Sequence, residues 1–329
     1  MRDFAYARAR QLDDTFHPTG SAMLLAGGTE LLNWLRLGIA EPEQVLDIGG
    51  LDTLRGVRRD GNAIVIGALT TLNEVGENPI VVSAAPALAQ ACLKAASAQI
   101  RNRATLGGNM LQKTRCSYFR AEEPLAWPCN KRVPGSGCSA RHGHHERHAI
   151  LGWTDACVAV QPSDPVVALA CLDAVAEVAD REGRRSIPMT EFHLTPEESD
   201  TLAETRLRPG ELITGFRVPL SALARRSTYV KVRERESYEY AFVSAAAALE
   251  LNSGIVREAR VALGSVALKP WRLTAAEGAL AGQPFSAERA RQAVAAAMAA
   301  ARPLGETDVK VSVATNAAVR ALELAAEVA

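Results

Sequence analysis

Four cysteines fall in a part of the chain that shows little secondary-structure pattern. They are Cys116, Cys129, Cys138 and Cys157, with the spacing C-x12-C-x8-C-x18-C. Four thiolates are the usual ligand set of a [4Fe–4S] cluster, and they also suit a structural zinc ion. The spacing lacks the close C-x2-C pairs of zinc ribbons, which disfavours zinc. Four unrelated thiols stay open as an alternative, because spacing alone does not exclude them.

The segment around these cysteines runs from Gln112 to about Gly152 and is rich in proline and glycine. A structureless loop of this length is uncommon in a compact domain unless it has a function or is held by a bound group. The segment also contains a histidine cluster, for which we expect a solvated polar loop rather than a metal site. Its members are His142, His144, His145 and His148. The other two cysteines, Cys92 and Cys171, lie in apolar stretches and are expected to be small core residues.

Two glycine motifs are the second candidate for chemistry. The first, AGGTE from Ala26 to Glu30, follows an apolar run and opens a helical pattern. The second, IRNRATLGGN from Ile100 to Asn109, again places two glycines beside hydroxyl and amide side chains. Glycine lets the backbone approach a ligand closely, so two such loops could hold one dinucleotide by its phosphates. Two unrelated tight turns fit the spacing equally well, and neither motif is the Rossmann G-x-G-x-x-G pattern.

Short strands and helices must position these motifs. Periodicity and turn residues predict strands before and after the first motif, a hairpin around Asp60-Gly61, and a domain boundary near Pro219 to Arg226. The predicted elements are the strands Met23–Ala26, Val45–Ile48 and Ala156–Val160, the hairpin Leu54–Leu69, the helix Pro86–Ser97, and two alanine-rich helices, Ser286–Ala301 and Thr315–Val328.

Composition limits the classes of function. The chain has 329 residues, and its 37 Lys and Arg balance 37 Asp and Glu. A zero net charge argues against a general nucleic-acid binder, which needs a basic excess. No apolar run is long enough to cross a bilayer, and the N-terminal sequence MRDFAYARARQ has no apolar core of a signal peptide.

Five motifs, in order, resemble those of the FAD-binding subunits of the xanthine dehydrogenase and carbon monoxide dehydrogenase group. They are LLAGGTELL, IRNRATLGGN, QPSD (Gln161 to Asp164), YVKVRERESYEYAFVSAAAAL and ALGSVALKPWR. The resemblance covers essentially the whole chain. It implies an α+β protein with a vanillyl-alcohol-oxidase-like (PCMH-type) FAD-binding domain of two α/β subdomains over residues 1–224, interrupted by an insert at 112–157. A C-terminal α+β domain like that of the CO dehydrogenase flavoprotein would follow over residues 225–329.

The same resemblance implies which residues bind FAD. The pyrophosphate would be wrapped by Ala26, Gly27, Gly28, Thr29, Glu30 and Leu31. The second phosphate and ribityl contact would come from Thr105, Gly107, Gly108 and Asn109. Asp164 would hold the ribityl or flavin side, and Lys231 would approach the flavin. No catalytic acid or base is expected on this chain.

The cysteine insert resembles a narrower set of proteins. CSYFRAEEPLAWPCNKRVPGSGCSARHG and DACVAVQPSD are similar to the flavin subunit of periplasmic aldehyde oxidoreductases, and the beta subunit of 4-hydroxybenzoyl-CoA reductase has a comparable insert. Both carry an extra [4Fe–4S] cluster on four cysteines. The resemblance therefore implies such a cluster on Cys116, Cys129, Cys138 and Cys157.

The implied protein is one subunit of a heterotrimeric molybdenum-dependent aldehyde oxidoreductase. A large molybdenum-cofactor subunit would oxidise the substrate, and a small [2Fe–2S] subunit would pass electrons to FAD here and on to an external acceptor. A xanthine dehydrogenase-like or 4-hydroxybenzoyl-CoA reductase-like subunit, a stand-alone flavoprotein and a zinc-stapled binding protein are the alternatives. The resemblance implies either a periplasmic location, by export with a signal-bearing partner, or a cytoplasmic one.

Overall fold

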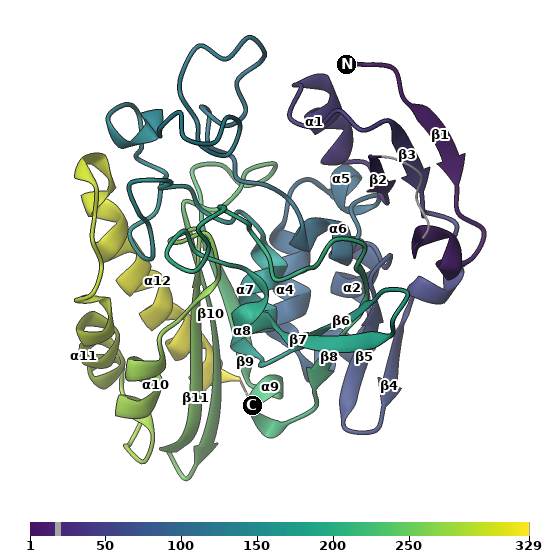
Figure 1. Cartoon of the computed structure of the whole chain (residues 1–329). Helices are drawn as coiled ribbons and strands as arrows, with labels where there is room; N and C mark the ends of the chain where they lie inside the picture. Colours follow the sequence, from purple (N-terminus) through teal and green to yellow (C-terminus); the bar gives the residue numbers. More distant parts are fainter. Residues whose placement is uncertain (17–20, 329) are drawn as a thin grey trace.

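The computed structural model describes residues 1–16 and 21–328. In this part of the chain the strands form three sheets, and helices pack between and outside them (Figure 1). This mixture confirms the expected α+β class. No helix of the described residues is long and apolar enough to cross a membrane.

The N-terminal sheet carries the first glycine motif. Its strands β1 (Ala5–Arg8), β2 (Ala22–Leu25) and β3 (Gln44–Asp47) are parallel, in the order β1-β3-β2. Helix α1 (Leu31–Arg36) connects β2 to β3, as parallel neighbours require a crossover. The strands predicted on either side of the motif are confirmed, and the motif occupies the turn between β2 and α1.

The second sheet is antiparallel and has the order β4-β5-β8-β6-β7. The predicted hairpin is confirmed, and Gly61 at its turn has a φ of 56° that favours glycine. Its strands are β4 (Val57–Asp60), β5 (Ala63–Gly67), β6 (Val175–Ala179), β7 (Arg184–Pro188) and β8 (Leu212–Pro219). The helices of this part of the chain are α2 (Leu72–Glu77), α3 (Pro79–Ala84), α4 (Pro86–Lys94), α5 (Ala98–Arg101), α6 (Leu106–Met110), α7 (Asp164–Cys171), α8 (Met189–Phe192) and α9 (Ala222–Arg225).

The third sheet is built around a strand that is buried on both faces. Residues of β10 alternate: Ala245 and Ala247 pack with the C-terminal helices, whereas Ala246 and Ala248 pack in the core that includes α4 and α7. This alternation follows from the two-residue repeat of a strand. The sheet has the order β12-β11-β10-β9. Its strands are β9 (Ser227–Val232), β10 (Val243–Asn252), β11 (Ile255–Gly264) and β12 (Trp271–Arg272), and the helices on its outer side are α10 (Thr274–Leu280), α11 (Ala287–Met298) and α12 (Asp308–Glu327) (Figure 1).

The insert over residues 112–157 contains little regular structure. A single short 3-10 helix, Ser139–Arg141, is the regular element among its residues. The predicted strand Ala156–Val160 is wrong, because the backbone there bonds to neighbouring loops: Ala149 N–H donates to the Val158 carbonyl at 2.8 Å, and Gln161 N–H donates to that of Ala267 at 2.9 Å. Further 3-10 turns are Leu12–Phe16, Asp52–Leu54 and Gly305–Thr307.

Two predicted helices have different ends in the structure. The helix predicted over Pro86–Ser97 ends at Lys94, and Ala96 beyond it has a φ of 42° that interrupts the helical backbone. The last helix starts at Asp308 rather than Thr315. The β-branched residues in its first turns hid the helical pattern in the sequence.

Candidate functional site

The two glycine motifs meet backbone to backbone. A Cβ atom at Gly27 would lie 1.9 Å from the carbonyl oxygen of Arg103, which belongs to the second motif. Gly28 has a φ of 75°, a conformation that side chains other than glycine rarely adopt. The close approach of the second loop therefore requires glycine at position 27, and the backbone conformation favours glycine at position 28.

The second loop is fixed by hydrogen bonds to its hydroxyl and amide side chains. Thr105 caps α6, and its Oγ1 accepts the N–H of Gly108 at 3.1 Å. Asn109 Oδ1 accepts the hydroxyl of Ser163 at 2.5 Å, which joins this loop to the QPSD motif. Gly107 packs so tightly that a Cβ there would lie 3.0 Å from Ala68. Three of the predicted FAD-binding segments thus converge in space.

Asp164 and Lys231 are brought together, but they face each other. Lys231 Nζ lies 2.9 Å from Asp164 Oδ2, and the Tyr229 hydroxyl donates to the other carboxylate oxygen. The side chains of Lys231 and Asp164 are 1% and 5% exposed. Burial raises the pKa of Asp164, and the ammonium group of Lys231 opposes this shift. The pair links α7 to β9, and a contact of either residue with a flavin stays a prediction.

All four insert cysteines line one cavity. Cys116, Cys129, Cys138 and Cys157 contribute to its wall, and all four are free thiols. Cys129 and Cys138 face each other across an isolated antiparallel bridge. Asn130 joins this pair to the segment before Cys157, because its Nδ2 donates to the Ala156 carbonyl at 2.9 Å. The expectation for the remaining two cysteines is confirmed, since Cys92 and Cys171 are buried in the hydrophobic core.

Backbone N–H groups point at the sulfur atoms of this cavity. Cys116 accepts from Phe119 and Tyr118, Cys129 from Lys131 and Arg132, and Cys157 from Ala159. Burial raises the pKa of Cys116 to about 11 and that of Cys157 to about 12, and these N–H donors oppose the shift. The donors favour the thiolate, which is the form of cysteine that binds metals.

Within the described ranges, no group of three His, Cys, Asp or Glu side chains is placed to hold one metal ion. Four-coordinate zinc needs its thiolates about 2.3 Å from one centre. Zinc and an iron–sulfur cluster both stay predictions for this cavity.

His148 is a further residue of the cavity wall, although the sequence placed it in a solvated histidine loop. Its side chain is 7% exposed, and both ring nitrogens lack a hydrogen-bond partner among the described residues. Burial lowers its pKa to about 4, with Lys310 acting in the same direction, so the ring is neutral at pH 7. The prediction of a solvated histidine loop is wrong for His148, which lines both the cysteine cavity and a pocket beside Arg115 and Tyr240.

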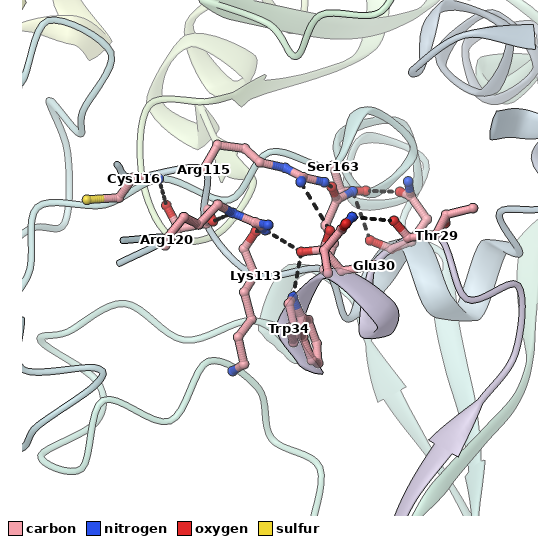
Figure 2. A network of polar contacts seen from close by, with 12 residues as sticks. Thr29, Glu30, Trp34, Lys113, Arg115, Cys116, Arg120 and Ser163 are labelled. Atoms are coloured by element: carbon pink, nitrogen blue, oxygen red, sulfur yellow. Dashed lines mark hydrogen bonds and ion pairs between the residues drawn. The ribbon is translucent and has the colours of Figure 1, made fainter. Parts of the chain in front are cut away.

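The glycine loops and the cysteine cavity are joined by a polar network (Figure 2). Glu30, at the end of the first glycine motif, contacts Arg115 and Arg120 on either side of Cys116. Sequence reasoning assigned Glu30 only to the pyrophosphate loop. Its arginine partners are 85 or more residues away along the chain, so the local sequence pattern does not indicate the pairing.

The sequence matches two family profiles that together span nearly all of it. Residues 2–221 match the FAD binding domain in molybdopterin dehydrogenase. Residues 228–325 match the C-terminal domain of the CO dehydrogenase flavoprotein. The described glycine loops lie in the first of these segments, and the alanine-rich strand β10 lies in the second.

Similar proteins are subunits of multi-subunit oxidoreductases. The chain is 42% identical over 260 residues to the FAD-binding subunit of an aldehyde oxidoreductase from Escherichia coli, covering 79% of each chain. It is 29% identical to the medium chain of carbon monoxide dehydrogenase from Hydrogenophaga pseudoflava, over 92% of this chain and 89% of that one.

A solved structure shows the same architecture. It is the carbon monoxide dehydrogenase of Hydrogenophaga pseudoflava that lacks the Mo-pyranopterin moiety of its cofactor. That structure aligns with a TM-score of 0.75 at 28% identity, over 98% of this chain and 97% of the other. The expected vanillyl-alcohol-oxidase-like FAD-binding fold, followed by the CO dehydrogenase flavoprotein-like domain, is thereby confirmed. The chain belongs to the family of FAD-binding subunits of the molybdenum hydroxylases.

Proposed function

We propose that this chain is the FAD and [4Fe–4S] electron-transfer subunit of a molybdenum-dependent aldehyde oxidoreductase. The observation that carries the proposal is the single cavity lined by all four insert cysteines. The 42% identity to an aldehyde oxidoreductase subunit supports the substrate class. When bound, FAD and an iron–sulfur cluster supply electron transfer between partner subunits and an external acceptor.

The residues of the cavity fit a cluster. Backbone N–H groups directed at cysteine sulfurs are among the features by which proteins stabilise and tune such clusters. Lys131, whose side chain is 5% exposed, favours the thiolate forms of Cys129 and Cys157 by its charge. The unpartnered ring of His148 supplies one more N–H donor at the wall. In this proposal Cys116, Cys129, Cys138 and Cys157 are the four ligands.

The residues of the glycine loops fit a dinucleotide. Gly27 lets the first loop approach the Arg103 carbonyl, and Gly107 lets the second loop pack against Ala68, so no side chain keeps these backbones apart. In this proposal residues Ala26 to Leu31 hold the pyrophosphate. Thr105 and Asn109 orient the second loop through the bonds that they make with Gly108 and Ser163.

The division of labour between subunits is part of the proposal. Related proteins are medium chains or FAD-binding subunits of larger enzymes. Substrate would be oxidised at a molybdenum cofactor on a large partner, and electrons would reach this chain through a small [2Fe–2S] partner. We expect aldehyde oxidation only in the assembled complex and none from the isolated chain.

The deciding experiment is an anaerobic absorption spectrum of the purified full chain, with flavin, iron and acid-labile sulfide quantified. About one flavin with about four irons and four sulfides per chain supports the proposal. Cys138→Ala should lose the iron, whereas Cys171→Ala, which removes a buried thiol outside the cavity, should keep it. Flavin without iron, or zinc in place of iron, would overturn the cluster assignment, and a folded chain that refuses added FAD would overturn the whole proposal.

A further inference from the structure

Glu30 belongs to the first glycine loop, yet its carboxylate points away from that loop. Glu30 occupies the N-cap position of α1 but makes no side-chain capping bond to the helix. Its Oε2 lies 3.0 Å from Arg115 Nη1, and its Oε1 accepts Trp34 Nε1–H at 2.8 Å and also contacts Arg120. The carboxylate is 13% exposed, so its charge is balanced by the two guanidinium groups rather than by water.

The two arginines enclose the first cysteine of the cavity. Arg115 directly precedes Cys116, and Arg120 N–H donates to the Cys116 carbonyl at 3.0 Å. The Arg120 side chain also donates to the carbonyls of Thr114 at 2.7 Å and Lys113 at 3.0 Å. The turn that presents Cys116 is therefore clamped by a side chain whose other contact is Glu30 (Figure 2).

The same network continues to the second glycine motif. Arg115 Nη2 donates to Gln112 Oε1 at 2.9 Å, and the Gln161 side-chain amide donates to the Gln112 carbonyl at 3.4 Å. Gln161 in turn accepts the N–H of Ser163 at 3.0 Å, and Ser163 bonds Asn109. A displacement of the Cys116 turn is thus transmitted to both glycine loops: to the first through the contacts of Glu30, and to the second through consecutive hydrogen bonds.

We propose that Glu30 is a positioning residue that couples the two cofactor sites, so that an occupied cysteine cavity raises the affinity for FAD and bound FAD stabilises the cluster. This inference rests on the proposed function. When a turn relaxes, a largely buried carboxylate loses its partners, and leaving such a charge unpaired is costly. Coupling between two binding sites is reciprocal, so each cofactor must favour the other by the same factor.

The test compares the wild-type full chain with Glu30→Gln, each in the native and in a cluster-free background. Cys129→Ala/Cys138→Ala provides the cluster-free background and leaves Cys116 and both arginines in place. FAD affinity is measured by flavin fluorescence titration, and cluster stability by the rate of iron loss to a chelator with and without FAD. We expect cluster loss to weaken FAD binding at least about fivefold, the lower end of the usual range for coupled sites.

The decisive readout is the protection that FAD gives to the cluster. Saturating FAD should slow iron loss in the wild type but not in Glu30→Gln. In the cluster-free background, Glu30→Gln should weaken FAD binding by a smaller factor than in the native one, because the coupling is already absent. Equal protection in both proteins, or an FAD affinity unchanged by cluster loss, would overturn the inference.

Matched variants separate coupling from general loosening. Arg115→Met should reproduce Glu30→Gln without altering the glycine loop, and Arg115→Lys should restore most of the protection. Glu204 is a similarly buried carboxylate, 15% exposed, that pairs with Lys131 of the insert but does not belong to the glycine loop. In fully iron-loaded protein, Glu204→Gln should leave FAD affinity within twofold of wild type. If it weakens FAD as much as Glu30→Gln, the inference fails.

The two proposals fail in different ways. A wild-type chain that binds flavin but never iron overturns the cluster assignment and this inference together. A chain that holds both cofactors and shows independent binding overturns only the coupling by Glu30.

Discussion

The insert and the C-terminal sheet with its helices are stabilised in contrasting ways. The C-terminal unit has a large buried apolar core, which includes Val261, Leu263 and Leu322. The insert has few buried apolar side chains and is held by side chains that bond its carbonyl groups. Arg132, for example, donates to the carbonyls of Phe119 at 2.9 Å and Ala121 at 3.0 Å. Apolar packing supports a unit by itself, whereas a polar loop depends on each directional contact and on what it binds.

The largest expected effect is on the insert when its bound group is lost. Cys138→Ala should leave the C-terminal core intact but open the insert, because ligand binding and local folding are coupled. Limited proteolysis mapped by mass spectrometry should show cleavage within residues 112–157 at least about a hundredfold faster than in the wild type. Cys92→Ala is the control, since that thiol is buried in the core. Equal cleavage of both variants would mean that the insert folds without a bound group.

The second prediction concerns loss of apolar packing in the C-terminal unit. Leu322 is fully buried on α12, and Leu322→Ala should lower the free energy of unfolding by about 2–5 kcal/mol. Denaturant titration measures the loss, and iron per chain at equilibrium should be unchanged. Arg320→Ala on the exposed side of the same helix should change stability by less than about 0.5 kcal/mol. Iron loss in Leu322→Ala would show that the stability of the insert depends on the packing of the C-terminal core.

Lys310 lies where the two regions meet and predicts a pH dependence. Its ammonium donates to the carbonyls of His148 at 2.8 Å and Ser265 at 2.7 Å, and burial lowers its pKa from 10.5 to about 7. Between these values the unfolded chain binds more protons than the folded one, so this group makes stability rise with pH. Below about pH 7 its contribution is constant.

The rise amounts to at most about 1.4 kcal/mol per pH unit. Urea unfolding at pH 7 and pH 9 should show it in the wild type, and Lys310→Met should remove it. If the difference in stability between the two proteins were independent of pH, the buried lysine would not titrate in this window.

The smallest expected effect concerns a single side chain of the insert. Asn130 donates to the Ala156 carbonyl at 2.9 Å and accepts the N–H of Gly137 at 2.7 Å. Asn130→Ala should cost roughly 1–2 kcal/mol of local stability, about 1 kcal/mol per hydrogen bond. Hydrogen exchange of the insert amides measures this cost. Asn316→Ala, on the exposed face of α12, should leave the exchange rates of those amides unchanged. If both variants speed the exchange, the effect is global rather than local to the insert.

The sequence predicted features that have a local signal. Strand–turn–helix patterns located the first glycine loop, and the Asp60-Gly61 turn located the hairpin, because both depend on neighbouring residues. The strand predicted over Ala156–Val160 was wrong, because an apolar run cannot show that its backbone partners are loops such as the one at Ala267.

Long-range electrostatics could not be read from the sequence. Glu30 and Arg115 carry no local sign of their pairing, and Lys310 lies before the helix predicted over Thr315–Val328. Asp164 and Lys231 were each expected near the flavin, which stays a prediction, but nothing in the sequence indicated that the two side chains bond each other. Such contacts depend on how distant segments are brought together, which short-range patterns do not encode.

The contact of Lys310 with the insert also has a consequence for the order of biosynthesis. The ribosome makes residues 112–157 well before α12, and domains generally fold as they emerge. The carbonyls of Arg147 and His148 therefore lack the hydrogen bonds from Lys310 until the last helix has been translated and has docked. The hydrogen bonds from Lys310 to the cysteine-bearing insert thus form late in biosynthesis, after the N-terminal sheet and both glycine loops have been made.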